Sequence, residues 1–293
     1  MRISTQYQFD RYSHEVNRAS EKYFNAQRTV STGKRIEAFS DDVLGATTTV
    51  SMRALRKGIE GYDDNLKQAK VSLSVSDNAL SETTAIINQA NQLAIQGANS
   101  PTDQTGRQGM VSQIRELQRR LLDVANTRGQ SGQYVFGGQK NDTPPLTVSG
   151  AVATFNGDTN PILVETDPTN TLQANITAGP QFKELYDRLE TLKTNLEGGN
   201  LGAISGISLG ELQDSLRKFN DMRGQVGARL QTVDIMSNQN SRRTDELSAG
   251  ISDIEDVDLS EAILNYKKAE AAYQGALTVA SKGFELSLMN FIR

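Results

Sequence analysis

Apolar residues recur at helical spacing through two long stretches of the chain, one on each side of residues 138–180. In the first stretch an aliphatic side chain returns every seven residues, at Leu66, Leu73, Leu80, Ile87 and Ala94. A heptad repeat is typical of a helix that packs along one seam. We therefore predict a helix over residues 63–98, ended by Asn99-Ser100-Pro101.

The same spacing predicts three further helices that each bury one face. A helix over residues 104–127 carries Val111, Ile114, Leu117, Leu121 and Ala125. A shorter helix that ends at Gly198-Gly199 carries Phe182, Leu185, Leu189, Leu192 and Leu196. A long helix carries Leu212, Leu216, Phe219, Val226, Leu230 and Val233.

The pattern continues nearly to both ends of the chain. The apolar spacing predicts one helix over residues 253–293. The acidic residues at its start lie where the helix macrodipole favours negative charge. Its apolar stripe consists of Leu259, Ile263, Tyr266, Tyr273, Leu277, Ala280, Phe284, Leu288 and Phe291. A weaker stripe near the N-terminus includes Ile3, Tyr7, Tyr23, Phe24 and Val30.

The prolines separate the two helical stretches. Five of the six prolines lie between residues 144 and 180, and proline inside a helix costs about 3 kcal/mol. Leu146-Thr147-Val148 and the run 151–155 flank Ser149-Gly150, which predicts a β-hairpin, and Ile162-Leu163-Val164 predicts another strand.

These patterns predict a mainly α protein with a long antiparallel helical bundle or coiled coil formed by both termini. We assign residues 1–45 and 250–293 to a terminal coiled-coil assembly domain, and residues 46–137 and 181–249 to a helical bundle. Residues 138–180 form a small, exposed, β-rich insert.

Two explanations fit apolar stripes at both ends: the ends pack on each other, or they pack on neighbouring subunits. A stripe at helical spacing is most often ordinary core. Two helices alone, however, bury little apolar surface, and the alanines of the last helix allow close approach on more than one face. We therefore predict a subunit-assembly seam that contains the nine C-terminal stripe residues together with Ile3, Tyr23 and Phe24.

Composition argues against an enzyme. The chain has no cysteine and one histidine, His14, so we expect no catalytic residues, no metal site and no cofactor.

Thr32-Gly33-Lys34 lacks the remainder of a phosphate-binding loop and is interpreted as a turn. Ser40 is interpreted as a helix N-cap that precedes Asp41 and Asp42. The net charge of −4 and the lack of a long apolar run indicate neither nucleic acid nor membrane as a partner.

Short motifs occur in order along both helical stretches. The N-terminal part contains Met1-Arg2-Ile3-Ser4-Thr5, Ser31-Thr32-Gly33-Lys34-Arg35-Ile36 and Ser40-Asp41-Asp42. Later parts contain Tyr134-Val135-Phe136-Gly137-Gly138, Val226-Gly227-Ala228-Arg229-Leu230 and Leu286-Ser287-Leu288-Met289-Asn290. The chain thereby resembles the bacterial flagellin superfamily, and within it the members that join the flagellar hook to the filament. Phe39 and Val43 stand where that family usually has proline.

The resemblance implies a structural protein that is exported unfolded by the flagellar type III route, without a cleaved signal peptide, and assembles outside the cell. The implied partners are a ring of like subunits, the other hook–filament junction protein (hook-associated protein 1), flagellin and an export chaperone. Three alternatives remain open: a flagellin-type filament subunit, a cytoplasmic coiled-coil scaffold and a hydrolase. A scaffold would not explain the proline-rich insert, and a hydrolase would lack a catalytic constellation.

Overall fold

The computed structural model describes residues 5–99 and 103–291, and the side chains of all of these except 5, 6, 8 and 284–291. The chain divides into two compact units, one formed by residues 1–57 with 243–293 and the other by residues 58–242. The fold is mainly α-helical with small antiparallel strand pairs, as the sequence predicts. Among the described residues, no helix combines the length and apolar character needed to cross a membrane.

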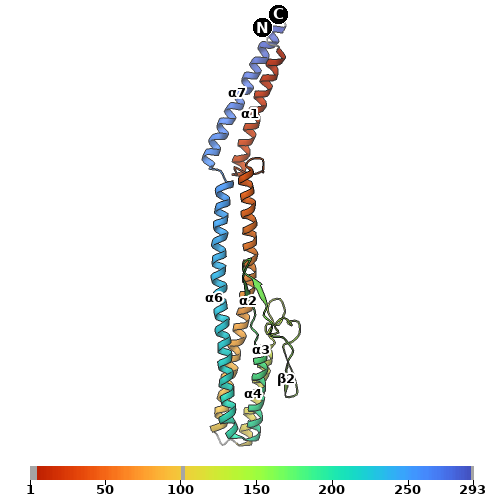
Figure 1. Ribbon diagram of the computed structural model, residues 1–293, viewed down its shortest axis with the longest axis vertical. Coiled ribbons are helices and arrows are strands. Elements are labelled where there is room, and N and C mark those ends of the chain that lie inside the picture. The colour runs from red at the N-terminus through yellow and green to blue at the C-terminus, as the bar shows by residue number, and fades with distance from the viewer. Residues whose placement is uncertain (1–4, 100–102, 292–293) are drawn as a thin grey trace. The chain divides into compact units, whose positions relative to one another are not determined.

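The first unit is built from helices contributed by both ends of the chain. It contains α1 (Thr5–Thr32), the beginning of α2 (Val43–Asn99), the end of α6 (Leu209–Glu255) and α7 (Leu259–Phe291). Helices α1 and α7 lie side by side and bring both chain termini to the same end (Figure 1). The pair is therefore antiparallel.

The second unit contains the rest of α2 and α6 together with α3 (Gln104–Ala125) and α4 (Gly179–Gly198). A short segment before α6 consists of α5 (Leu201–Ala203) and the π-helical turn η1 (Ile204–Ser208), neither of which the sequence indicated. Between α3 and α4 lie strands β1 (Leu146–Ser149), β2 (Val152–Phe155), β3 (Leu163–Glu165) and β4 (Thr171–Gln173).

The apolar faces predicted from the sequence form the core of the second unit. All five heptad positions of α2 from Leu66 to Ala94 are completely buried, and so are the five predicted positions of α4. Three rings join α4 and α6 to the segment after α3: Phe182 packs 4.8 Å from Phe136 and 5.2 Å from Phe219, measured between ring centroids. Burial of large side chains on this scale supplies most of the unit's stability.

The strands form two hairpins that pack on these helices. β1 pairs with β2 as predicted, and β3 pairs with β4, a strand that the sequence did not reveal. Leu146 and Ala153 of the first hairpin belong to the main core. The guanidinium of Arg229 on α6 donates to the Asn175 carbonyl (2.6 Å) and to Gln173 Oε1 (2.9 Å), which holds the second hairpin on α6.

Three helix boundaries differ from the prediction. Helix α2 begins at Val43, twenty residues before the expected start at residue 63. The expected single helix over residues 253–293 is interrupted, because α6 ends at Glu255 and α7 begins at Leu259. Asp258 caps α7 by accepting from the amide nitrogens of Ser260 (2.7 Å) and Glu261 (3.4 Å). At the start of α2 the cap is Asp42, which accepts from Gly45 N at 2.9 Å, and not Ser40.

An ion-pair cluster between α4 and α6 leads to a prediction about pH. Asp214 lies 3.0 Å from Arg188 and 3.2 Å from Lys218, and its pKa is lowered to about 2, first by Arg188 and then by Lys218. The pKa of Asp214 in the folded protein lies below its ordinary value of 3.8. The ion pairs of Asp214 therefore stabilise the fold fully above pH 3.8, and this stabilisation is lost as the pH falls toward 2. We expect Asp214→Asn to be less stable than the parent near neutral pH and to lose less stability on acidification. Urea unfolding at several pH values measures both effects, and parallel pH profiles for the two proteins would contradict the assignment.

Candidate assembly surface

Helices α1 and α7 pack through positions that alternate by four and three residues. On α1, half-buried positions at this spacing are Tyr12, Val16, Ala19, Tyr23, Ala26 and Val30. On α7, half-buried or buried positions are Ala262, Tyr266, Ala269, Tyr273, Ala276, Ala280 and Gly283. This spacing is the seam of a coiled coil, and the many alanines allow the two helix axes to lie close together.

Tyrosines provide most of the packing in the middle of this seam. The ring of Tyr23 stacks on Tyr273 with centroids 5.6 Å apart and lies 5.5 Å from Tyr266. The hydroxyls of Tyr23 and Tyr266 are 3.3 Å apart, and this hydrogen bond raises the pKa of Tyr23. The aromatic contacts hold α1 and α7 together at mid-length.

The predicted C-terminal stripe divides between two faces of α7. Tyr266 and Tyr273 contact α1 and Ala280 is buried, whereas Leu259, Ile263 and Leu277 remain 55%, 50% and 44% exposed. The pairing with α1 therefore covers only part of the stripe. The side chains of Phe284, Leu288 and Phe291 lie outside the described residues, although the helix includes their positions.

The N-terminal members of the predicted seam also differ in environment. Tyr23 faces α7, while its neighbour Phe24 is 60% exposed. Ile3 lies outside the described residues. A pair of helices thus leaves apolar side chains of both partners in contact with water.

A second exposed apolar patch lies at the start of α2 and was missed by the sequence reasoning. It consists of Phe39, Val43, Leu44, Val50 and Leu55. Val43 and Val50 lie one heptad apart, as do positions of the other stripes, and this spacing could have indicated these two members. Phe39 and Val43 are 59% and 67% exposed, and the ring of Phe39 also lines a cavity together with Ile36 and Val50.

The two units differ sharply in where their apolar side chains lie. Every member of the main core cluster falls between Leu66 and Val233, within the second unit. Of the nineteen large hydrophobic side chains described as exposed, thirteen belong to the first unit, although it is the smaller of the two. The first unit therefore exposes more of its large apolar side chains to solvent than the second unit does.

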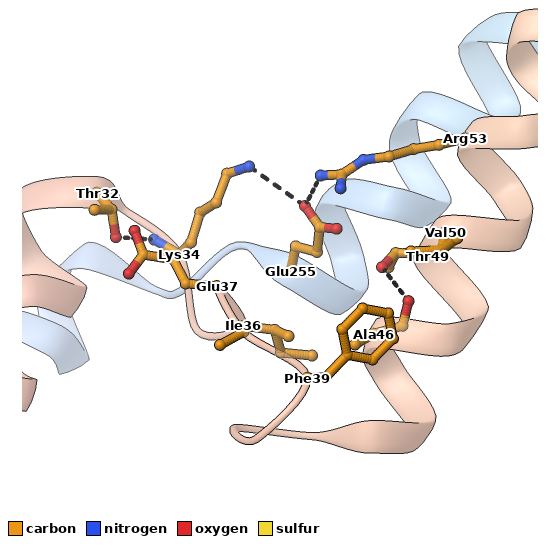
Figure 2. Close-up of a pocket in the computed structure, with 11 residues that line it drawn as sticks. Thr32, Lys34, Ile36, Glu37, Phe39, Ala46, Thr49, Val50, Arg53 and Glu255 are labelled. Atoms are coloured by element: carbon orange, nitrogen blue, oxygen red, sulfur yellow. Dashed lines mark hydrogen bonds and ion pairs between the residues drawn. The ribbon is translucent and has the colours of Figure 1, made fainter.

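The connectors that interrupt the terminal helices meet at Glu255. Its side chain is 5% exposed, and its carboxylate lies 3.4 Å from Lys34 Nζ and 2.5 Å from Arg53 Nη2. Figure 2 shows this carboxylate between the two cations, beside a cavity of about 330 Å³ that is also lined by Ile36, Phe39 and Val50. Removal of either cation would leave the buried carboxylate underpaired, which would destabilise the junction of the two connectors.

The charged side chains at this surface are engaged in helix caps and ion pairs. Among the residues that the structure describes, no group of three or more His, Cys, Asp or Glu side chains could hold a metal ion. Charged groups here act as caps and ion pairs: the pKa of Asp42 is lowered first by the Gly45 amide, and that of Asp258 first by the Ser260 amide.

Comparison with known proteins assigns both helical stretches to one family. The N-terminal helical region of bacterial flagellin matches residues 3–141, and the C-terminal helical region matches residues 209–292. The chain belongs to the bacterial flagellin family. The two matched regions include all of α1 and α7 and leave most of the strand-bearing segment unmatched.

Several flagellin-family relatives are similar to the chain over nearly its whole length. Flagellar hook-associated protein 3 of Salmonella typhimurium and of Escherichia coli are each 23% identical, over 94% of this chain and 95% of theirs. A flagellar filament core protein of Treponema maltophilum is 22% identical over 86% of this chain and 85% of its own length. These relatives are flagellar structural proteins.

Solved structures share the fold. The structure of flagellar hook-associated protein 3 from Legionella pneumophila has a TM-score of 0.64 at 13% identity, and covers 69% of this chain and 98% of its own. FlgL of Bacillus cereus gives a TM-score of 0.61 at 19% identity, with coverage of 69% and 99%. At sequence identities of 13% and 19%, these similarities show that the chain has the same fold as those proteins.

The contrast between the units predicts a gradient of local stability in the isolated chain. We expect backbone amides of α1 and α7 to exchange with solvent at least about tenfold faster than those of α3 and α4, because few apolar contacts protect them. Hydrogen exchange followed by mass spectrometry on dilute protein tests this. Equal protection of the segments around Tyr273 and Leu189 would contradict it.

Proposed function

We propose that this chain is a structural subunit of the bacterial flagellum that joins the hook-associated region to the flagellin filament. The observation that carries the proposal is the similarity to hook-associated protein 3 from two bacteria over 94% of the chain. Matches to flagellins from Clostridium tyrobutyricum and Listeria monocytogenes, by contrast, span 43% and 38% of the chain.

Assembly through the first unit explains its exposed apolar surface. Burial of a large aliphatic side chain is worth about 1.5–3 kcal/mol, and several such groups lie in water on α7 and at the start of α2. In a ring of like subunits each copy would cover these groups on its neighbours. Some residues of the predicted seam would thus pack within the subunit, and the others would pack between subunits.

The proposed neighbours follow from a position at the junction. One axial face of the ring would meet hook-associated protein 1, and the opposite face would meet flagellin. Both partners are expected to present helical stripes like those of α1 and α7. Contacts of this kind are dominated by apolar packing and need no cofactor.

We propose that the chain is exported unfolded by the flagellar type III route. It would then fold and assemble outside the cell. The absence of cysteine suits such transit because no disulfide can form on the way. An export chaperone would shelter the apolar stripe of α7 before secretion. Deletion of residues 5–20 is expected to abolish secretion, and normal secretion of that variant would contradict the route.

A filament subunit is the second candidate, favoured by the Treponema maltophilum filament protein that matches 86% of this chain. Deletion of the gene followed by electron microscopy separates the two. A junction subunit predicts bare hooks with flagellin shed into the medium, whereas a filament subunit predicts loss of filament protein from the medium as well. Normal filaments in the deletion strain would refute both.

A further inference from the structure

The first unit carries two separate apolar patches that remain in contact with water in the single chain. The α2 patch is the exposed group at the start of α2: Phe39, Val43, Leu44, Val50 and Leu55. The α7 patch lies at the start of α7, and its members are at least half exposed: Leu259, Ile263 and Leu264. Since burial of one such side chain is worth about 1.5–3 kcal/mol, covering either patch is favourable.

The two patches lie on opposite sides of this unit. In Figure 1 the connector of residues 33–42, which leads into the α2 patch, bulges to the right of the helices, whereas α7 begins at their left. Unlike surfaces on two sides of a subunit make a head-to-tail contact, which repeats from copy to copy and closes into a ring or continues as a helix. Contact between like patches would instead end at a dimer.

The shapes of the two patches complement each other. The cavity of about 330 Å³ beside Glu255 is lined by Phe39 and Val50 of the α2 patch, together with the buried Ile36 (Figure 2). On α7, by contrast, Leu259 and Ile263 project from neighbouring turns of a helix surface. Side chains of one helix that enter a hollow lined by apolar groups give knobs-into-holes packing.

Opposite charges flank the two patches. The segment 51–57, within the α2 patch, contains three basic residues and no acid: Arg53, Arg56 and Lys57. The segment 252–261, which leads into the α7 patch, contains five acids and no basic residue, and only Glu255 among them is buried. The other four acids are exposed: Asp253, Asp256, Asp258 and Glu261. Two α7 patches would therefore repel each other, whereas an α7 patch is attracted to an α2 patch.

We propose that the α7 patch of one copy packs against the α2 patch of the next copy, and that this head-to-tail contact repeats through the assembly. The inference deepens the proposed function and rests on it, because it needs copies of the chain to be neighbours in the flagellum. Every copy carries both halves of the contact, so identical chains cover both patches without a second protein.

Disulfide formation between copies in isolated flagella tests this contact. The chain has no cysteine, so the introduced cysteines are the only ones it carries. Thr47 lies one turn after Val43, and Ser260 directly follows Leu259, so Thr47→Cys and Ser260→Cys place thiols within the patches and keep every apolar group. A disulfide forms only where two Cβ atoms come within about 4.5 Å. After mild oxidation and immunoblotting, we expect the double variant to give a ladder of dimers, trimers and larger multimers that a reductant collapses.

The single variants separate this arrangement from others. Each single variant should remain monomeric, and cells that produce both should yield dimers and nothing larger, since each chain then carries one half of the pair. Thr47→Cys combined with Thr154→Cys is the matched control, because Thr154 is an exposed residue of β2 in the second unit. This control should give no ladder.

Several results would overturn the proposal. A dimer from either single variant would show that like patches meet, and a crosslink to a different protein would show another occupant. Monomers alone would also overturn it, if they are found both for the first double variant and for Ser51→Cys with Ser260→Cys, in which one thiol is moved by a turn of α2. Monomers within flagella that contain the chain leave the proposed function standing, whereas absence of the parent chain from flagella refutes that function and the contact with it.

Discussion

We expect the Leu277→Asp variant to be folded and secreted but absent from flagella. Leu277 is 44% exposed on α7, so the substitution removes little packing within the subunit. In an assembled ring the same position would place a carboxylate in an apolar contact, which costs at least the 1.5–3 kcal/mol gained by burying leucine. The cost recurs at every subunit interface, so incorporation should fall by well over tenfold.

The matched control for this variant is Leu163→Asp. Leu163 is 57% exposed on β3, so the chemical change and the loss of exposed apolar surface are closely similar, but the site lies in the second unit. Immunodetection of each variant in sheared flagella and in the culture medium measures incorporation and secretion separately. Equal incorporation of both variants would show that the exposed stripe of α7 is not an assembly surface.

Phe182→Ala is expected to produce the largest loss of stability. Phe182 is completely buried and its ring packs at a steep angle against both Phe136 and Phe219, so its truncation leaves a cavity where three segments meet. Substitutions of this kind cost about 3–5 kcal/mol. Since domains of ordinary size are stable by about 5–15 kcal/mol, the change should lower the midpoint of urea unfolding substantially.

The same substitution at Phe24 is the control. Phe24 is 60% exposed on α1, and we expect its replacement by alanine to change the unfolding free energy by less than about 0.5 kcal/mol. If Phe24 contributes to subunit contacts, Phe24→Ala should impair assembly more than Phe182→Ala does. A small effect of Phe182→Ala on unfolding would contradict the assignment of the core to the second unit.

Local periodicity was sufficient to locate the core of the second unit. The heptad from Leu66 to Ala94 and the stripe from Phe182 to Leu196 are fully buried as predicted, because a long helix with one apolar face has only one way to shelter it. The β1–β2 hairpin was equally predictable from its turn residues. Strand β4 was not, since Thr171-Leu172-Gln173 has no distinguishing pattern and is held by its pairing with β3.

The candidate surface was predicted less completely. The sequence placed nine C-terminal residues on one stripe, and periodicity alone could not separate the positions that contact α1 from those left in water. Tyr266 and Leu259 occupy equivalent places in the pattern, yet one packs on Tyr23 and the other is exposed. The width of the stripe exceeds what one partner helix can cover.

The sequence by itself determined the helical character of both ends, the mainly α fold and the family, because these depend on spacing and motifs within short segments. Tertiary structure alone decided where the C-terminal helix breaks. The interruption at residues 256–258 exists because Glu255 and Val257 hydrogen-bond to a segment more than two hundred residues earlier. No local pattern encodes such a contact, since its partners become neighbours only after α2 and α6 have brought the two connectors together.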